Sequence, residues 1–139
     1  MVLKIKDTIL PILLLLTGAL IYIGFRSNTL FLNRWIDIIF NTETLNNFRN
    51  ICKSLNMPQW IIYSLPDGLW ITAYLLLINK IWSNHHALSY KVFIYIMPAF
   101  AIILEFLQFI GLCPGTYDHI DLICYIIPTL ILTPLKYEF

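Results

Sequence analysis

Polar and ionisable side chains interrupt the apolar second half of the chain. Glu105 and Gln108 stand in an otherwise apolar run, and their spacing places them on one face of a helix. Asp118, His119 and Asp121 follow after a short connection. Such groups can bind cations, move protons or act as a general base, and an ionisable group within a membrane helix is usually functional. The structural alternative for Glu105 and Gln108 is a buried polar pair that ties helices together by hydrogen bonds.

Helix capping is the structural alternative for the three aspartates. The segment from Ser64 to Asp67 fits a capping box, in which Ser64 is the N-cap and Asp67 is the third residue of the helix. Asp118 can cap the last apolar segment in the same way, with Asp121 at the third position. A cap needs only one carboxylate, whereas two aspartates and His119 stand together here. This excess favours a function for Asp118 and Asp121, and Asp67 joins them as a further candidate.

The composition restricts the class of protein. Of the 139 residues, 59% are hydrophobic and 12% are charged, and the mean hydropathy is +0.75. A soluble domain carries about 25% charged residues, so the composition excludes a soluble globular enzyme and a disordered chain. Nine basic residues stand against eight acidic ones, which excludes a basic nucleic-acid-binding protein. A small all-α membrane protein is the class that remains.

Four apolar segments are predicted to be transmembrane helices of a single domain over residues 1–139. A helix needs about 20 apolar residues to cross the hydrocarbon core of a bilayer, with a range of about 17 to 25. The predicted spans cover residues 8–25, 65–82, 92–112 and 119–135, each with bounds that are approximate.

The connection between the first two spans is predicted to contain amphipathic interfacial helices, over residues 28–58. The segments Leu30–Asn41 and Glu43–Leu55 each have apolar residues at helical spacing and polar residues on the remaining face. Short amphipathic helices beside spans lie in the plane of the interface with the apolar side toward the lipid. They are expected either to form a scaffold over the spans or to recognise a lipid or a partner.

The basic residues predict the orientation of the spans, because cytoplasmic connections are enriched in Lys and Arg. The residues that favour the cytoplasmic side are Lys4, Lys6, Lys80, Lys91 and Lys136. The first connection opposes them with Arg26, Arg34, Arg49 and Lys53. The prediction is a multi-pass protein with both termini in the cytoplasm. The candidate carboxylates then share the outer half of the bilayer, with Arg26 as the nearest cation.

The second half of the sequence resembles a known family. The run E-F-L-Q at residues 105–108 and the turn C-P-G-T-Y-D-H-I-D at residues 113–121 resemble the VanZ-like family of small polytopic bacterial membrane proteins. The matching residues are Glu105, Gln108, Asp118 and Asp121. The sequence departs from the family in the turn, where Gly115 and Thr116 stand in place of a common Arg. The resemblance implies a cell-envelope protein of the bacterial inner (cytoplasmic) membrane with a link to antibiotic resistance.

Together these features predict an outward-facing acidic pocket that binds a lipid head group, a cell-wall precursor or a glycopeptide-type ligand. The expected ligand-binding residues are Glu105, Gln108, Asp118, Asp121, Asp67 and His119. The expected partners are the lipid bilayer, an envelope ligand of this kind and a second copy of the chain. No cofactor and no nucleic acid is expected, and the sequence leaves the question of a metal open.

Three other functions stay open at this point. A small cation- or proton-conducting protein would need an oligomer, because four short spans line a pore poorly. A non-catalytic accessory subunit would use the polar residues only to hold helices together. An intramembrane enzyme could use Glu105 or Asp121 as a general base or a metal ligand. The enzyme is the less favoured reading, because it requires a substrate that the sequence does not indicate.

Overall fold

The computed structural model describes residues 5–26, 35–36, 38, 42–82 and 88–133. These residues form helices and connecting turns, without a strand among them, so the all-α prediction is confirmed for this part of the chain. In chain order the helices are α1 (Ile5–Phe25), α3 (Thr42–Ser54), α4 (Gln59–Tyr63), α5 (Leu65–Ile81), α6 (Leu88–Phe109) and α7 (His119–Leu132).

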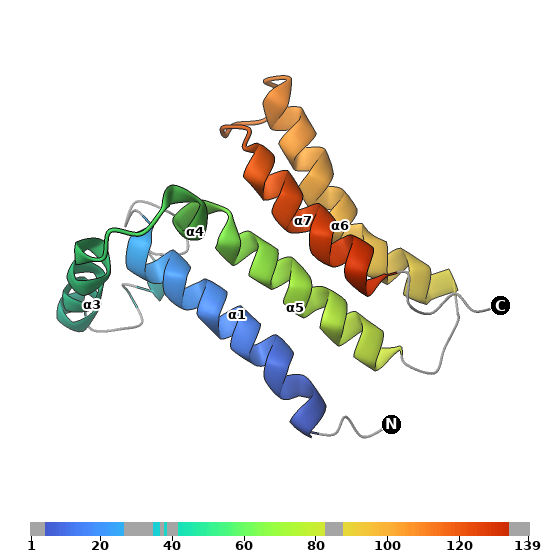
Figure 1. The fold of residues 1–139 in the computed structure, drawn as a ribbon, viewed down its shortest axis with the longest axis horizontal. Helices are drawn as coiled ribbons and strands as arrows, with labels where there is room; N and C mark the ends of the chain where they lie inside the picture. The colour runs from blue at the N-terminus through green and yellow to red at the C-terminus, as the bar shows by residue number, and fades with distance from the viewer. Residues whose placement is uncertain (1–4, 27–34, 37, 39–41, 83–87, 134–139) are drawn as a thin grey trace.

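Two antiparallel helix pairs form the body of the molecule (Figure 1). α1 lies alongside α5, and α6 lies alongside α7. α7 also packs against α5, so that α5 occupies the centre. α3 lies across the C-terminal end of α1, and the short α4 leads into α5. As a result, the end of α1, the start of α5, the end of α6 and the start of α7 lie toward the same end of the molecule, where the two pairs diverge.

Two of these helices are long and apolar enough to cross a membrane. The segments are Thr8–Phe25 in α1 and Leu88–Phe109 in α6. Only 17% of each segment is buried within the structure, which differs from the core helix of a soluble protein. α5 has 17 residues and α7 has 14. A helix therefore occupies each of the four predicted spans, and two of the four have the length and apolar character of a span.

α6 ends earlier than the sequence predicts. The apolar residues up to position 112 suggest a helix that continues to that point, but α6 ends at Phe109. Gly111 has a φ of +75°, a conformation that favours glycine, and the Leu112 N–H donates back to the Leu107 carbonyl at 2.8 Å. This glycine turn ends α6 and returns the chain toward the start of α7.

Glycines allow the central helices to approach closely. A Cβ atom at Gly18 of α1 would lie 2.5 Å from the Trp70 Nε1 atom of α5. The same Trp70 N–H donates a hydrogen bond to the Leu15 carbonyl at 3.3 Å. On the other side of α5, a Cβ atom at Gly68 would lie 2.9 Å from the Cys124 Cβ atom of α7. Small residues at such contacts are typical of packing between membrane helices.

A polar clamp joins three helices at the end of α5 that is remote from α4. The Asn79 amide donates to the Leu132 carbonyl of α7 at 2.9 Å, and its oxygen accepts from the Tyr90 hydroxyl of α6 at 2.6 Å. An apolar core adjoins this clamp. Its buried members are Ile71, Leu75, Tyr90, Ile94 and Tyr125. The helices are therefore held together at this end by both hydrogen bonds and apolar packing.

The amphipathic connection is confirmed in part. α3 covers Thr42–Ser54, close to the predicted helix over Glu43–Leu55. It packs a buried arginine against α1, since Arg49 is only 2% exposed and its Nε donates to the Ile23 carbonyl at 3.2 Å. The sequence predicts only that the apolar side of this helix faces the lipid, whereas the structure adds an arginine that binds a C-terminal carbonyl of α1. Most of the other predicted helix, Leu30–Asn41, lies outside the described residues.

Candidate functional site

A cavity of about 720 Å³ lies between α5, α6 and α7 and the end of α1. We call it the acidic cavity. Its polar lining consists of Arg26, Tyr63, Asp67, Trp70, Tyr74, Glu105, Gln108, Thr116, Asp118, Asp121 and Tyr125. Its remaining wall consists of Ile71, Met97, Phe100, Ala101, Leu104 and Gly115. Sites for small molecules typically have volumes of about 300 to 1,000 Å³, so the acidic cavity has the size of a ligand site.

Five of the six residues predicted to bind a ligand line this cavity. They are Asp67, Glu105, Gln108, Asp118 and Asp121, and they come from α5, α6 and the start of α7. The prediction for His119 is wrong in position, because its side chain is 76% exposed and does not line the cavity. His119 is the first residue of α7 and points outward beside Asp118, with Nδ1 and Oδ1 3.7 Å apart.

Asp118 has the structural role that its position in the sequence indicates. It is the N-cap of α7, and its Oδ1 atom accepts from the Ile120 N–H at 2.9 Å. The backbone N–H of Asp118 in turn donates to the Glu105 Oε2 atom of α6 at 3.4 Å. Glu105 is only 5% exposed. A buried carboxylate of α6 therefore meets the positive N-terminal end of α7.

The capping box predicted at Ser64 does not form. Ser64 has a helical conformation, with φ of −96° and ψ of −38°, and its side chain makes no capping hydrogen bond. The reason is that α4 runs directly into α5. The Ser64 N–H bonds to the Trp60 carbonyl, and the Ser64 carbonyl accepts from the Gly68 N–H. The first turn of α5 thus lies within a nearly continuous helical path, so that it leaves no free helix end for Ser64 to cap.

Asp67 therefore takes part in no capping box with Ser64. Both Asp67 and Asp121 face polar groups of neighbouring helices. The Tyr125 hydroxyl of α7 faces the Asp67 carboxylate, and the Ser64 hydroxyl faces the Asp121 carboxylate. Within the described part of the chain, neither Ser64 Oγ nor Asp121 Oδ1 completes a hydrogen bond, although both atoms are buried. Buried polar atoms without a partner are rare in folded proteins, and here the two atoms belong to groups that face each other.

One cation stands at the rim of the acidic cavity. Arg26 donates from a guanidinium nitrogen to the Tyr63 carbonyl at 3.0 Å. Its Cζ atom lies 5.2 Å from the centre of the Tyr22 ring and 5.0 Å from that of Tyr63. Its charge also acts on the carboxylates of Asp67 and Asp121. Of the basic residues that the structure describes, Arg26 is the one that lines the acidic cavity.

The cavity has a strongly acidic balance. Four carboxylates and one guanidinium of the described residues line it, and these five groups have a formal charge of −3 when all of them are ionised. In the described residues, no three His, Cys, Asp or Glu side chains are placed to hold a metal ion together. The carboxylates instead surround a space. This arrangement can bind an organic cation through several charge-assisted hydrogen bonds.

Aromatic residues complete the lining, and the sequence analysis did not select them. Trp70 and Tyr74 follow Asp67 on one face of α5 at helical spacing, and Tyr63 stands at the rim. Their helical spacing from Asp67 indicates that they share its face. This spacing alone does not identify them as cavity residues, because aromatic residues in a membrane helix also occur on faces that meet lipid.

Gly115 lets the turn before α7 approach Gln108 closely. Its φ is +137°, and a Cβ atom there would lie 2.7 Å from Gln108 Nε2. A side chain at this position would displace Gln108 from the wall of the cavity. The absence of a side chain at Gly115 therefore leaves room for Gln108 in the wall of the cavity.

No family model matches this sequence, and neither a curated protein nor a solved structure matches it.

Proposed function

We propose that this chain is a VanZ-like membrane protein of the bacterial cell envelope whose acidic cavity binds a ligand with an amine group. The ligand would be a lipid head group, a cell-wall precursor or a glycopeptide. One observation carries the proposal. Four carboxylates from three parts of the fold line one cavity of about 720 Å³, and the part of the chain that the structure describes adds a single guanidinium to this lining. Such a surface is complementary to a cation, and its rings can contribute further through cation–π contacts.

The membrane placement that we propose has four spans, formed by α1, α5, α6 and α7. α1 and α6 meet the length of a span on their own. α5 and α7 would cross as partners packed against them. The outward faces of α1 and α6 support this placement, because large apolar side chains such as Leu10, Leu16 and Phe106 are more than half exposed.

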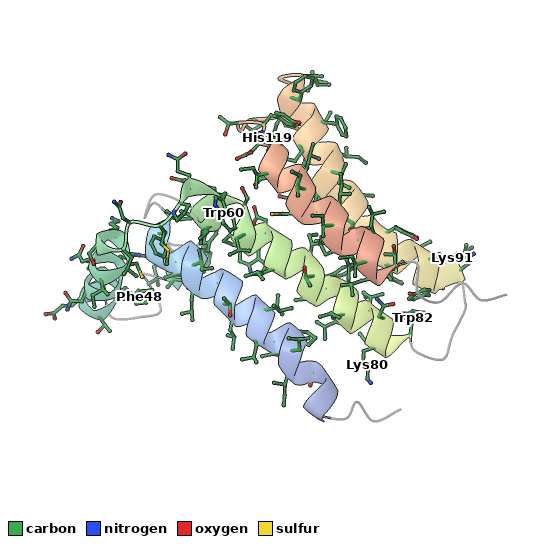
Figure 2. The ribbon with its side chains drawn as sticks, in the orientation of Figure 1. Phe48, Trp60, Lys80, Trp82, Lys91 and His119 are labelled. Atoms are coloured by element: carbon green, nitrogen blue, oxygen red, sulfur yellow. The ribbon has the colours of Figure 1, made fainter. Side chains whose placement is uncertain are left out.

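The orientation that we propose places both termini in the cytoplasm of the inner membrane. Figure 2 shows that Lys80 and Lys91 lie together at the end of the bundle opposite to His119. Trp82 lies beside them, and Trp60 lies toward the other end, as in the aromatic belts of membrane proteins. The lysine end is therefore assigned to the cytoplasm and the acidic cavity to the outer side.

Conduction of cations or protons is less well supported by the packing. Beyond the cavity, Leu75 and Ile94 are at most 1% exposed and belong to the apolar core next to Asn79. A path through one copy of the described helices would have to cross this core. Binding requires no such path, and we therefore favour binding over transport.

Binding of soluble probes to the protein in nanodiscs tests the proposal. The probes are glycerophosphoethanolamine, which is a lipid head group without acyl chains, and the glycopeptide teicoplanin. Substitutions Glu105→Gln and Asp121→Asn remove a charge with little change of shape, and we expect each to weaken binding by at least about 10-fold, since a charged hydrogen bond contributes about 1.5 to 3 kcal/mol. Glu43→Gln, on the exposed start of α3, is the matched control.

The controls for this experiment concern folding. Each variant should keep the helical circular dichroism and the unfolding temperature of the wild type within about 3 °C, a shift that corresponds to about 1 kcal/mol or less. If Glu105→Gln and Asp121→Asn are folded and bind both probes as the wild type does, or if the wild type binds neither probe, the proposed function is wrong.

A further inference from the structure

The carboxylates of the acidic cavity lie toward one end of α5 and of α6, and aromatic or apolar residues follow them along both helices. On α5, Asp67 lies near the end that joins α4, and Trp70, Ile71 and Tyr74 follow deeper in the cavity. α6 runs in the opposite direction to α5. Its polar residues therefore lie near the same end and its apolar residues lie deeper. The α6 residues of the lining, from the polar to the apolar end, are Gln108, Glu105, Leu104, Ala101, Phe100 and Met97.

The cavity therefore consists of an acidic half and an apolar half. The apolar wall of α6 from Leu104 to Met97 covers seven residue steps, or about 10 Å along the helix. A small hydrophilic cation would occupy only the acidic half. A ligand that fills both halves must carry a polar group and an apolar chain side by side.

The apolar half also opens sideways. Met97 and Phe100 line the cavity, yet they are 45% and 56% exposed. Both belong to the segment of α6 that is long and apolar enough to cross a membrane. In the membrane placement proposed above, the exposed sides of these residues meet acyl chains. A ligand can then reach the acidic half directly from the bilayer.

We propose that the occupant is a phospholipid with a primary ammonium in its head group. Its ammonium would lie among the carboxylates, and the upper part of one acyl chain would lie between α5 and α6. This inference rests on the proposed function and names the class of its ligand. Among the described residues, four carboxyl groups and one guanidinium line the cavity, a balance that favours a cation, and the buried Asp121 Oδ1 atom can accept from one of the three N–H donors of an ammonium. Arg26 at the rim fits the phosphate.

Lipid retention in native mass spectrometry tests the inference. The protein is purified in detergent with equal amounts of dioleoyl phosphatidylethanolamine and phosphatidylcholine, which share chains and net charge but differ in N–H donors. We expect at least about 10-fold preference for the ethanolamine lipid, because the choline group cannot donate to a carboxylate. Glu105→Gln should reduce this preference to less than about 3-fold.

A second variant tests the place of the acyl chain. Ala101→Phe fills the apolar half of the cavity, and Met97→Trp does so from the lipid-exposed side if the first variant fails to fold. We expect either variant to lose the retained lipid by at least about 10-fold while it still binds glycerophosphoethanolamine. Ala99→Phe is the matched control, because Ala99 is exposed on α6 and does not line the cavity.

The outcomes separate this inference from the proposed function. Equal retention of the two lipids, or retention unchanged by folded Ala101→Phe and Met97→Trp variants, would overturn the inference. The proposed function would still stand in either case if a soluble probe binds the wild type and Glu105→Gln weakens that binding. If the wild type shows no lipid preference and binds no soluble probe, the inference and the proposed function are both wrong.

Discussion

Asp118 combines two roles that substitution can separate, namely the cap of α7 and a negative charge in the acidic cavity. Its Oδ1 atom accepts from the Ile120 N–H at 2.9 Å. Asparagine retains an oxygen at this position and is as good an N-cap as aspartate, whereas alanine has no acceptor. We therefore expect Asp118→Ala to lower the free energy of unfolding by about 1 kcal/mol, within a range of about 0.5 to 2 kcal/mol.

The expected effect of Asp118→Asn on stability is smaller because two electrostatic contributions oppose each other. Loss of the charge removes a favourable interaction with the helix dipole of about 0.3 to 1 kcal/mol. It also removes repulsion from the carboxylates of Glu105 and Asp121, on which the charge of Asp118 acts. We expect a net change within about 0.5 kcal/mol for this variant.

Thermal unfolding in detergent measures the difference between the two variants. About 1 kcal/mol corresponds to roughly 3 to 5 °C for a chain of this length, so Asp118→Ala should unfold that much earlier than Asp118→Asn. Binding of glycerophosphoethanolamine should weaken in both variants, because both lack the charge. His119→Ala is the local control, since its side chain is 76% exposed and does not line the cavity.

Two results would refute this reasoning about Asp118. If Asn and Ala lower the unfolding temperature equally, the charge and not the hydrogen bond stabilises the start of α7. If Asp118→Asn binds the probe as tightly as the wild type, Asp118 contributes only a cap, and the charge of the cavity that matters for binding comes from the other carboxylates.

Further predictions concern packing and thiol chemistry. Gly68→Val should destabilise the protein by about 1 to 3 kcal/mol, since even a Cβ atom there would lie 2.9 Å from a side-chain atom of α7; the control Ala99→Val, on the exposed side of α6, should change stability by less than about 0.5 kcal/mol. Equal stability of the two variants would contradict the close helix contact. Asn79→Leu removes hydrogen bonds to both α6 and α7 and should cost about 1 to 3 kcal/mol in a denaturant titration, so wild-type stability would rule out a structural role for the clamp. Burial raises the pKa of the Cys52 thiol, so N-ethylmaleimide should modify it more slowly than the half-buried Cys113 at neutral pH; mass spectrometry of the peptides would show the opposite order if α3 were not packed on α1.

The sequence predicts the helices well because each of them is a long apolar run, which can be recognised without knowledge of tertiary contacts. Apolar runs of 14 or more residues locate α1, α5, α6 and α7 without information on their contacts. The bounds are less predictable where backbone conformation decides them. α6 ends before Gly111 although the chain remains apolar to Leu112, because the glycine turn at φ of +75° is not visible in hydropathy.

The candidate site is predictable where helical spacing and burial agree. Glu105 and Gln108 share a face, and both line the acidic cavity. The position of His119 could not be predicted, because at the first residue of a helix a small rotation decides between the cavity and the outside. The capping box at Ser64 is absent for a different reason. A capping box requires a free helix end, and the continuation of α4 into α5 depends on tertiary packing that the sequence pattern does not reveal.

The Asn79 clamp fixes one end of α5, and the acidic cavity lies at the other end of the same helix. Asn79 and Asp67 are twelve residues apart on α5, or about 18 Å along the helix axis. If α5 tilted by about 2° about Asn79, Asp67 would move by about 0.6 Å. This displacement is larger than the spread of donor–acceptor distances in hydrogen bonds, which is about 0.5 Å. The clamp at Asn79 and the close contact of Gly68 with Cys124 must therefore together restrict rotation of α5 for Asp67 to keep facing Tyr125.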